Sequence, residues 1–163
     1  LEGGSELGGE VDVARVLAEE AERIAPEAKA AGVEVEVTGD GSARIRGSDR
    51  DLSLLVRNLL DNAIRYASEG GKVRASTRRD GGEILLAVED DGVGIPTRDL
   101  PRVFERFYRV DRGRSRETGG TGLGLAIVRH VAENHGGTAR IESELGRGTT
   151  VEVRFPAPVG LPA

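Results

Sequence analysis

The sequence predicts an α+β fold with two layers, in which a mixed, largely antiparallel sheet is covered on one face by three helices. Three stretches have the apolar spacing of amphipathic helices, and about six have the alternation or β-branched content of strands. Short turns join most consecutive strands, which favours a sheet of mainly antiparallel neighbours. The 163 residues suffice for one domain with a core, and residues 10–156 are expected to form it.

The first third of the chain is predicted to contain one helix and one hairpin. Apolar residues from Val13 to Ile24 are spaced three and four apart, which predicts a helix to about residue 31, with Pro26 as a kink or break. Alternation over 33–37 predicts a strand, and residues 43–46 are expected to pair with it as a hairpin. Residues 1–9 are rich in glycine and are expected to be a flexible linker.

The remaining elements follow in the same way. A second helix is predicted over 49–67, with an apolar face formed by Leu52, Val56, Leu59, Leu60, Ala63 and Ile64. Strands at 72–79 and 83–90 flank Asp80-Gly81-Gly82 and predict a second hairpin. A third helix is expected over about 121–134, followed by strands at 138–143 and 149–155. Residues 157–163 are expected to be a disordered tail.

Composition excludes several classes of protein. There is no Cys, so disulfides, thiolate nucleophiles and Cys-based metal sites are ruled out, and the formal net charge of -5 argues against a nucleic-acid surface. No apolar run has the length of a membrane span, and no signal-peptide pattern opens the chain, so we expect a soluble chain that is not membrane-bound. The chain has no Met, and we expect it to be a piece of a longer protein.

Two glycine-rich segments flank the long irregular stretch 91–120. "VEDDGVGIP" ends a strand at Asp90, and "GGTGLGL" opens the third helix. A glycine inside a helix costs about 0.5–1 kcal/mol relative to alanine, which indicates that some feature requires the bare backbone there. Neither segment completes a P-loop or the G-x-G-x-x-G fingerprint, and each alone fits a pair of turns at least as well.

The second helix also carries a polar stripe. Asn58, Asn62 and Arg65 fall within about 60° of one another on the side opposite the apolar face. An amide oxygen can ligate Mg²⁺, and a guanidinium can meet phosphate oxygens, so the stripe suits a metal-bound polyphosphate. By itself, the stripe fits a solvated helix face at least as well.

Taken together, five segments resemble the N, G1, F, G2 and G3 boxes of the ATP-binding catalytic domain of sensor histidine kinases. They are, in order, "NLLDNAIRYA", "DDGVGIP", "VFERFYRVD", "GGTGLGLAIV" and "GRGTT", and the resemblance covers roughly residues 10–156. It implies the Bergerat fold, an α/β sandwich shared with DNA gyrase, the Hsp90 chaperones and MutL, in which a mobile lid covers ATP. The implied cofactors are ATP and Mg²⁺.

The resemblance implies a role for each matching residue. Asp90 is expected to accept a hydrogen bond from the adenine amino group, assisted by Thr149 directly or through water, and Asn62 to ligate Mg²⁺. Asn58, Arg65 and Arg109 are the expected catalytic residues, the first two also contacting the nucleotide; Arg65 stands where Lys is common. The other expected nucleotide contacts are Tyr66, Gly92, Gly94, Ile95, Gly120, Thr121, Gly122, Leu123, Gly124 and Leu125.

The segment 98–117 is the expected lid. It holds seven Arg against four acidic residues, so its local charge is positive within an acidic chain. We expect a bound triphosphate to order part of this segment, and ADP to order it less. A solvated run of charges is the alternative interpretation.

Asn58 separates the two enzymatic alternatives. ATPases of the superfamily have Glu at this position to activate water, and a neutral amide cannot accept a proton, so a poor ATPase is expected. The implied acceptor is a His on a separate helical dimerisation domain. His130 and His135 lie outside the H-E/D-x-x-x-P setting of that acceptor and are expected to be structural or exposed. Asp91 stands where the family most often has Asn, which puts nucleotide affinity in question.

The resemblance also implies partners and a location. The partners are the helical phosphoacceptor domain and a response regulator, with no nucleic acid. The fragment is expected to be monomeric and on the cytoplasmic side, and the parent protein to be a homodimer anchored in the bacterial plasma membrane. A nucleotide-binding interaction module of the anti-sigma type is the alternative from another functional class.

Overall fold

The computed structural model of the chain describes residues 9–39, 41, 43–108 and 124–158. Its elements are, in order, β1 (Glu10–Asp12), α2 (Val13–Ala30), β2 (Glu34–Thr38), β3 (Arg44–Arg46), α3 (Asp49–Tyr66), β4 (Lys72–Asp80), β5 (Glu83–Asp90), the 3-10 helix η1 (Thr97–Arg102), α5 (Gly124–Asn134), β6 (Thr138–Glu144) and β7 (Gly148–Pro156). The expected catalytic residue Arg109, the expected nucleotide contacts Gly120, Thr121, Gly122 and Leu123, and residues 109–117 of the expected lid lie outside the described residues.

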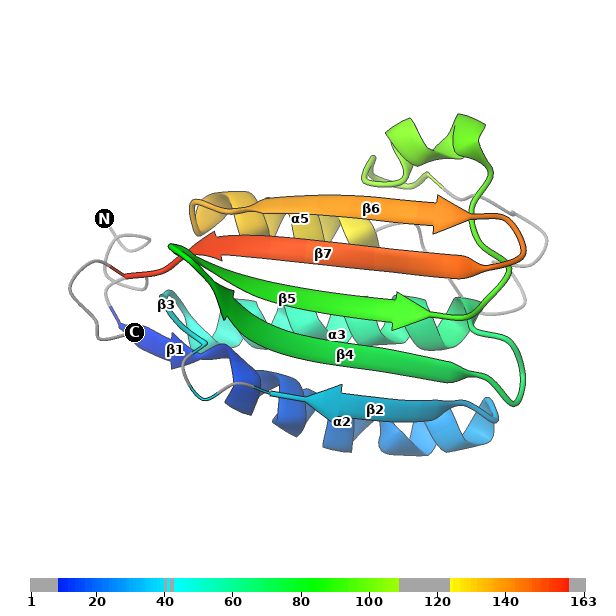
Figure 1. Cartoon of the computed structure of the whole chain (residues 1–163), viewed down its shortest axis with the longest axis horizontal. Helices are drawn as coiled ribbons and strands as arrows, with labels where there is room; N and C mark the ends of the chain where they lie inside the picture. The colour runs from blue at the N-terminus through cyan, green and yellow to red at the C-terminus, as the bar shows by residue number, and fades with distance from the viewer. Residues whose placement is uncertain (1–8, 40, 42, 109–123, 159–163) are drawn as a thin grey trace.

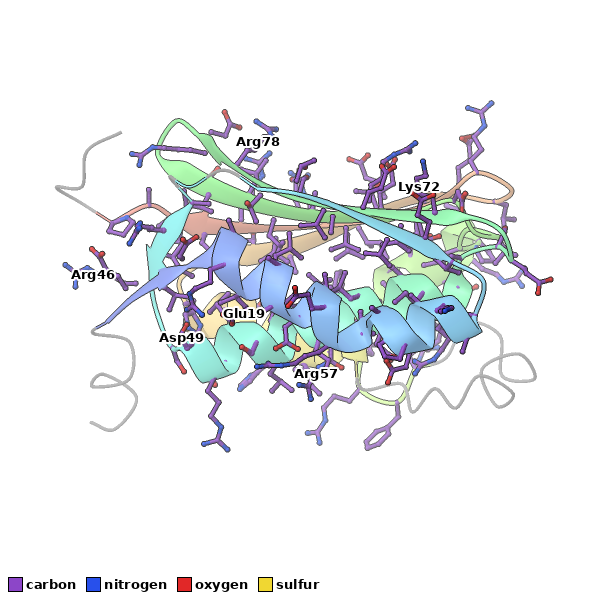
Figure 2. The ribbon with its side chains drawn as sticks, turned by 90° about the horizontal axis from the view of Figure 1, so that it is seen from below. Glu19, Arg46, Asp49, Arg57, Lys72 and Arg78 are labelled. Atoms are coloured by element: carbon purple, nitrogen blue, oxygen red, sulfur yellow. The ribbon has the colours of Figure 1, made fainter. Side chains whose placement is uncertain are left out.

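One layer is a five-stranded sheet with the strand order β2-β4-β5-β7-β6 (Figure 1). Strands β2 and β4 are parallel, and the other neighbours in this sheet are antiparallel. Helices α2, α3 and α5 cover one face (Figure 1), and the other face carries charged side chains such as Lys72 and Arg78 (Figure 2). The predicted two-layer α+β fold is confirmed.

Helix α2 begins after Asp12, whose side chain accepts a hydrogen bond from the N–H of Arg15 at 3.2 Å. The helix continues through Pro26 to Ala30, so the break considered from the sequence does not occur. Pro26 is exposed, and water can take the place of the hydrogen bond that its nitrogen cannot donate. The side chains that α2 buries against the core include Val13, Val16, Leu17, Ile24 and Ala28.

Helix α3 lies at the centre of the helical layer and packs against both α2 and α5. The Ser48 hydroxyl caps its N-terminus by accepting a hydrogen bond from the N–H of Asp51 at 3.2 Å. The predicted apolar face is confirmed and also includes Leu55, which is fully buried. This face rests on the sheet, so the opposite side of α3 is left for polar residues.

The predicted hairpin over residues 33–46 is wrong. β2 joins the large sheet beside β4, whereas β3 pairs with β1 in a separate two-stranded sheet, with Ile45 opposite Val11. Both of these side chains are 1% exposed, so this small sheet closes the core at the beginning of α2 and α3. Turn residues report only on local geometry and cannot indicate which distant strand offers more burial.

Candidate functional site

Three polar side chains form a row across the end of the large sheet. Asp90 lies opposite Thr149 in the β5–β7 pair, and Thr149 lies opposite Ser143 in the β6–β7 pair. Residues that are directly opposite in neighbouring strands project to the same face of a sheet. Asp90 and Thr149 are 4% and 7% exposed. The row therefore borders the apolar core on the side that the helices cover.

Asp90 is the ionisable group of this row. Its Oδ1 accepts a hydrogen bond from the N–H of Gly92 at 2.8 Å. Burial raises the pKa of Asp90 from its ordinary value of 3.8 to about 6, and backbone N–H groups of Gly92 and Thr149 oppose that shift. At neutral pH the carboxylate is thus mainly ionised and only accepts hydrogen bonds. A buried acceptor of this kind suits a ligand that brings N–H groups.

Gly92 and Gly94 lie in the loop that follows β5. A Cβ atom at Gly92 would overlap the carbonyl oxygen of Tyr66, and one at Gly94 would overlap the carbonyl oxygen of Glu144. Gly94 also has a positive φ of 77°, which a side chain disfavours. The loop is therefore wedged between the end of α3 and the end of β6. Packing within the protein is therefore one reason why both positions are glycine. The space for a purine, which the resemblance implies, would be a second reason.

Ser143 belongs to this row although it is not among the residues predicted from the sequence. Its Oγ accepts a hydrogen bond from the N–H of Ile95 at 2.7 Å and donates one to the carbonyl of Gly148 at 2.9 Å. It also lies 2.7 Å from Oγ1 of Thr149. The period of β6 could have revealed it, because Ser143 follows the core-facing residues Ala139 and Ile141 as a polar member of an apolar column.

A second part of the site lies where α3 and α5 pack together. A Cβ atom at Gly124 would be 3.3 Å from Oδ1 of Asn58. Asn58 donates a hydrogen bond from Nδ2 to the carbonyl of Leu54 at 2.8 Å, and Asn62 is half-buried one turn further along α3. The structure thus brings Asn58 to the beginning of α5, where Leu125 is buried, and places Asn62 on the next turn of α3.

Two charged residues near the site are held by neighbours. Arg65 donates a hydrogen bond to Asp61, with 2.7 Å between Nη2 and Oδ2. Asp91 accepts a hydrogen bond from the N–H of Lys72 at 3.1 Å, so its carboxylate faces the loop between α3 and β4. The negative charge of Asp91 still raises the pKa of Asp90. The contact of Arg65 with phosphate stays a prediction.

The two histidines have structural or exposed positions, as predicted. His135 is buried; its Nδ1 lies 2.8 Å from the carbonyl oxygen of Val131, and its Nε2 accepts a hydrogen bond from the N–H of Ser48 at 3.3 Å. His130 is exposed and lies 3.1 Å from the side-chain amide nitrogen of Asn134. His135 therefore joins the end of α5 to the beginning of α3.

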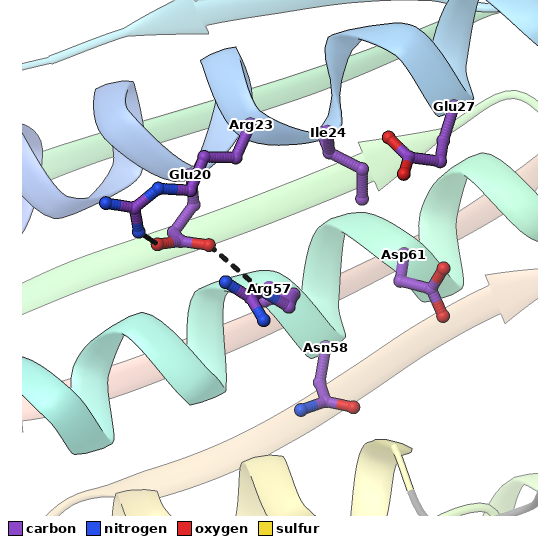
Figure 3. A pocket seen from close by; sticks show the side chains of 7 residues that line it. All are labelled: Glu20, Arg23, Ile24, Glu27, Arg57, Asn58 and Asp61. Carbon is purple, nitrogen blue, oxygen red and sulfur yellow. Dashed lines mark hydrogen bonds and ion pairs between the residues drawn. The ribbon is translucent and has the colours of Figure 1, made fainter.

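A charged groove of about 310 Å³ lies between α2 and α3 (Figure 3). Glu20 is 1% exposed and forms ion pairs with Arg23 and Arg57, the latter with 3.2 Å between Nε and Oε1. Asn58 also lines this groove, together with Ile24, Glu27 and Asp61. The groove is bordered by charged side chains of both signs.

Two classes of feature are not found in the described part of the chain. No three or more His, Asp or Glu side chains gather there as a metal cluster. None of its helices combines the length and the apolarity needed to cross a bilayer.

The fold and the order of the segments that form the site define a known class of protein. Residues 47–159 match the family model of the histidine kinase-, DNA gyrase B-, and HSP90-like ATPases. The chain belongs to this family. The matched range contains α3, the loop after β5, α5 and the row formed by Asp90, Thr149 and Ser143.

Similar proteins narrow the class to the sensor histidine kinases. The chain is 45% identical over 148 residues to the sensor-like histidine kinase SenX3 of Mycobacterium tuberculosis, a match of 91% of this chain and 36% of that protein. The solved structure of the mycobacterial sensor histidine kinase MprB matches with a TM-score of 0.80 and 32% identity, over 93% of this chain and 99% of that chain. The structure of full-length ShkA in complex with AMPPNP matches with a TM-score of 0.77 and 30% identity, over 95% of this chain and 32% of that chain.

These likenesses identify the chain as a histidine kinase catalytic domain of that family. It spans about a third of the length of the curated relatives that it matches first.

Proposed function

We propose that the chain binds Mg-ATP and donates the γ-phosphoryl group to a histidine on a separate helical dimerisation domain. The observation that carries the proposal is the buried carboxylate of Asp90, which sits beside Thr149 in a family whose members bind ATP. A carboxylate in this position accepts hydrogen bonds from the adenine amino group. The ShkA structure holds AMPPNP, which supports a nucleoside triphosphate as the ligand.

The triphosphate is proposed to lie along α3 at the beginning of α5. Asn58 packs there against Gly124, and Asn62 would ligate Mg²⁺ through its amide oxygen. Since the described residues hold no acidic metal cluster, phosphates and water would supply the other oxygens that Mg²⁺ prefers. The helix N-terminus and its glycines would offer backbone N–H groups to the phosphates. When bound, the metal ion would neutralise phosphate charge during transfer.

Arg65 would meet the phosphates only by leaving Asp61. That ion pair is partly buried, with the side chains of Arg65 and Asp61 21% and 46% exposed, and exposed pairs of this kind contribute about 0–1 kcal/mol. A phosphate oxygen also accepts charge-assisted hydrogen bonds from a guanidinium, so a bound triphosphate would compete with Asp61 for Arg65.

The phosphoryl acceptor is proposed to be outside this chain. His135 is buried between α3 and α5, and His130 is an exposed residue of α5 beside Asn134. The natural acceptor would be the helical domain of the parent sensor kinase, which would pass the phosphoryl group to a response regulator. The parent is further proposed to be a homodimer anchored in the bacterial plasma membrane, with this domain on the cytoplasmic side.

The transfer can be tested by mixing the chain with a helical hairpin that carries a phosphoacceptor histidine and with ATP labelled at the γ-phosphate. We expect label on the hairpin, no label on the chain alone, and little phosphate release. Binding of ATP without transfer would instead identify the anti-sigma-like module. Rapid phosphate release without an acceptor would identify an ATPase.

The metal role of Asn62 needs its own measurement. Asn62→Ala should weaken the binding of Mg-ATP at least about tenfold while changing the binding of Mg-free ADP much less, because only the former needs the amide ligand. Asn134→Ala, on the exposed side of α5, is the matched control. Equal losses for both nucleotides in calorimetry would remove the metal role.

A further inference from the structure

The hydroxyl of Ser143 has three hydrogen-bond neighbours, and their chemistry determines the direction of each bond. A hydroxyl has one proton and two lone pairs. The N–H of Ile95 can only donate, so it takes one lone pair of Ser143. The carbonyl of Gly148 can only accept, so it takes the one proton.

The remaining neighbour is therefore constrained. Thr149 lies 2.7 Å from Ser143, and the only capacity that Ser143 has left is its second lone pair. Thr149 must donate its own hydroxyl proton to Ser143. The Thr149 hydroxyl then has only its two lone pairs left for further hydrogen bonds, so it can only accept hydrogen bonds from a ligand.

This constraint acts next to Asp90. Thr149 and Asp90 are opposite each other in register, and such pairs have Cβ atoms about 4.5–5.5 Å apart. The ionised carboxylate is an acceptor as well, so two acceptors stand side by side in a buried place. A ligand that fits them must present two donors, as the two N–H bonds of an exocyclic amino group do.

We propose that Ser143 is a positioning residue for the nucleotide base: it takes the proton of Thr149 and thereby orients the Thr149 oxygen toward the amino group of the purine. The proposal rests on the proposed function, because it assumes a purine nucleotide in this site. Ser143 also holds the loop after β5 through Ile95, so the two sides of the base pocket are joined by one hydroxyl.

The test compares ATP with purine riboside triphosphate, which has the same phosphates and lacks the amino group. Calorimetry on the whole chain should show that Ser143→Ala lowers the affinity for ATP by about three- to tenfold, the size of one lost hydrogen bond, and the affinity for the other nucleotide by less than about twofold. A merely structural residue would lower both affinities equally. Thr149→Val should reduce the ratio of the two affinities in the same way, and Ser143→Thr, which keeps the hydroxyl, should restore it.

The controls separate this inference from the function on which it rests. Ser76→Ala removes a hydroxyl from β4 outside the row and should leave both affinities unchanged. Failure of the unmodified chain to bind ATP would overturn the proposed function. Normal ATP binding together with an unchanged affinity ratio in Ser143→Ala would overturn the role of Ser143 alone. If Ser143→Ala does not fold, Thr149→Val decides, because an unchanged ratio in that variant also overturns the inference.

Discussion

The α-carbon of Gly92 packs directly on the backbone carbonyl of Tyr66, with no space between them for a methyl group. This contact joins the loop that follows Asp90 to the end of α3. The two halves of the site, one expected to hold the base and the other the phosphates, are therefore held together by backbone atoms that cannot rotate away.

Substitution of Gly92 should reveal this contact. Gly92→Ala is expected to lower the free energy of unfolding by at least about 2 kcal/mol, because the obstructing atoms are backbone. Gly82→Ala is the matched control, since a Cβ there meets no atom within 4 Å and the change should be close to neutral. Urea unfolding of the two variants measures the difference. Equal stabilities would show that the loop can move away from α3.

Asp90 should give stability an identifiable dependence on pH. Its pKa is about 6 in the folded protein and near 3.8 otherwise, so the folded state binds the proton more tightly. The stabilisation from protonated Asp90 is present below about pH 3.8 and is lost as the pH rises through about 6, by about 2–3 kcal/mol. Asp90→Asn removes this dependence. Urea unfolding should show that, as the pH rises from 4 to 7, the free energy of unfolding of the variant increases relative to that of the unmodified chain. A difference that stays constant with pH would contradict the prediction.

Nucleotide binding should respond to the same titration in the opposite sense. Below about pH 6 the protonated carboxyl of Asp90 loses acceptor capacity, so affinity for ATP should decrease. The terminal phosphate also titrates near pH 6, so purine riboside triphosphate, with identical phosphates, is the control. The ratio of the affinity for ATP to that for purine riboside triphosphate, measured by calorimetry, should rise as the pH is raised from 5 to 7.5 for the unmodified chain and stay flat for Asp90→Asn. A flat ratio in both would remove Asp90 from base recognition.

In the groove between α2 and α3, removing the arginines of the ion pairs should destabilise the protein more than removing the carboxylate of Glu20. Glu20 is 1% exposed, whereas the side chains of Arg23 and Arg57 are 61% and 59% exposed. Removing both arginines leaves a buried carboxylate without a counter-charge and should cost at least about 2 kcal/mol. Glu20→Met removes the buried charge, leaves the arginines in water, and should change stability by less than about 1 kcal/mol. Urea unfolding compares the two, and a larger loss in Glu20→Met would contradict this account.

The two histidines offer an internal comparison of buried and exposed positions. His135→Ala opens a cavity beside Phe155 and leaves the N–H of Ser48 without its acceptor, so a loss of about 2–4 kcal/mol is expected. His130→Ala should stay within about 0.5 kcal/mol. Thermal unfolding monitored by circular dichroism distinguishes them. Similar melting temperatures would mean that α5 is not tied to α3 through His135.

Much of the fold is predictable because its signals are local. The spacing of apolar residues reveals the buried face of α3, and Asp80-Gly81-Gly82 reveals the turn between β4 and β5. The pairing of β2 with β4 is not predictable in this way. A parallel neighbour is reached through a helix and a second sheet, and no residue within 33–46 reports on it.

The site shows the same division. The glycines and amides that resemble family motifs stand out in the sequence, whereas Ser143 looks like an ordinary polar residue in a strand. Its importance comes from three partners that lie 5, 6 and 48 residues away. The register of β6 against β7 brings Gly148 and Thr149 to its oxygen atom, and the path of the loop after β5 brings Ile95.

The small sheet of β1 and β3 lies at the end of the domain opposite to Asp90. Glu10 lies beside β3 before the beginning of α3, and Pro156 ends β7 opposite Glu83, whereas Asp90 lies at the far end of β5 (Figure 1). Helix α3 runs between these ends, and its 18 residues span about 27 Å. A rotation of about 20° around Glu10 would carry the far end through about 9 Å. A rotation at the base of the domain thus becomes a displacement about three times the length of a hydrogen bond at the end of the sheet that carries Asp90.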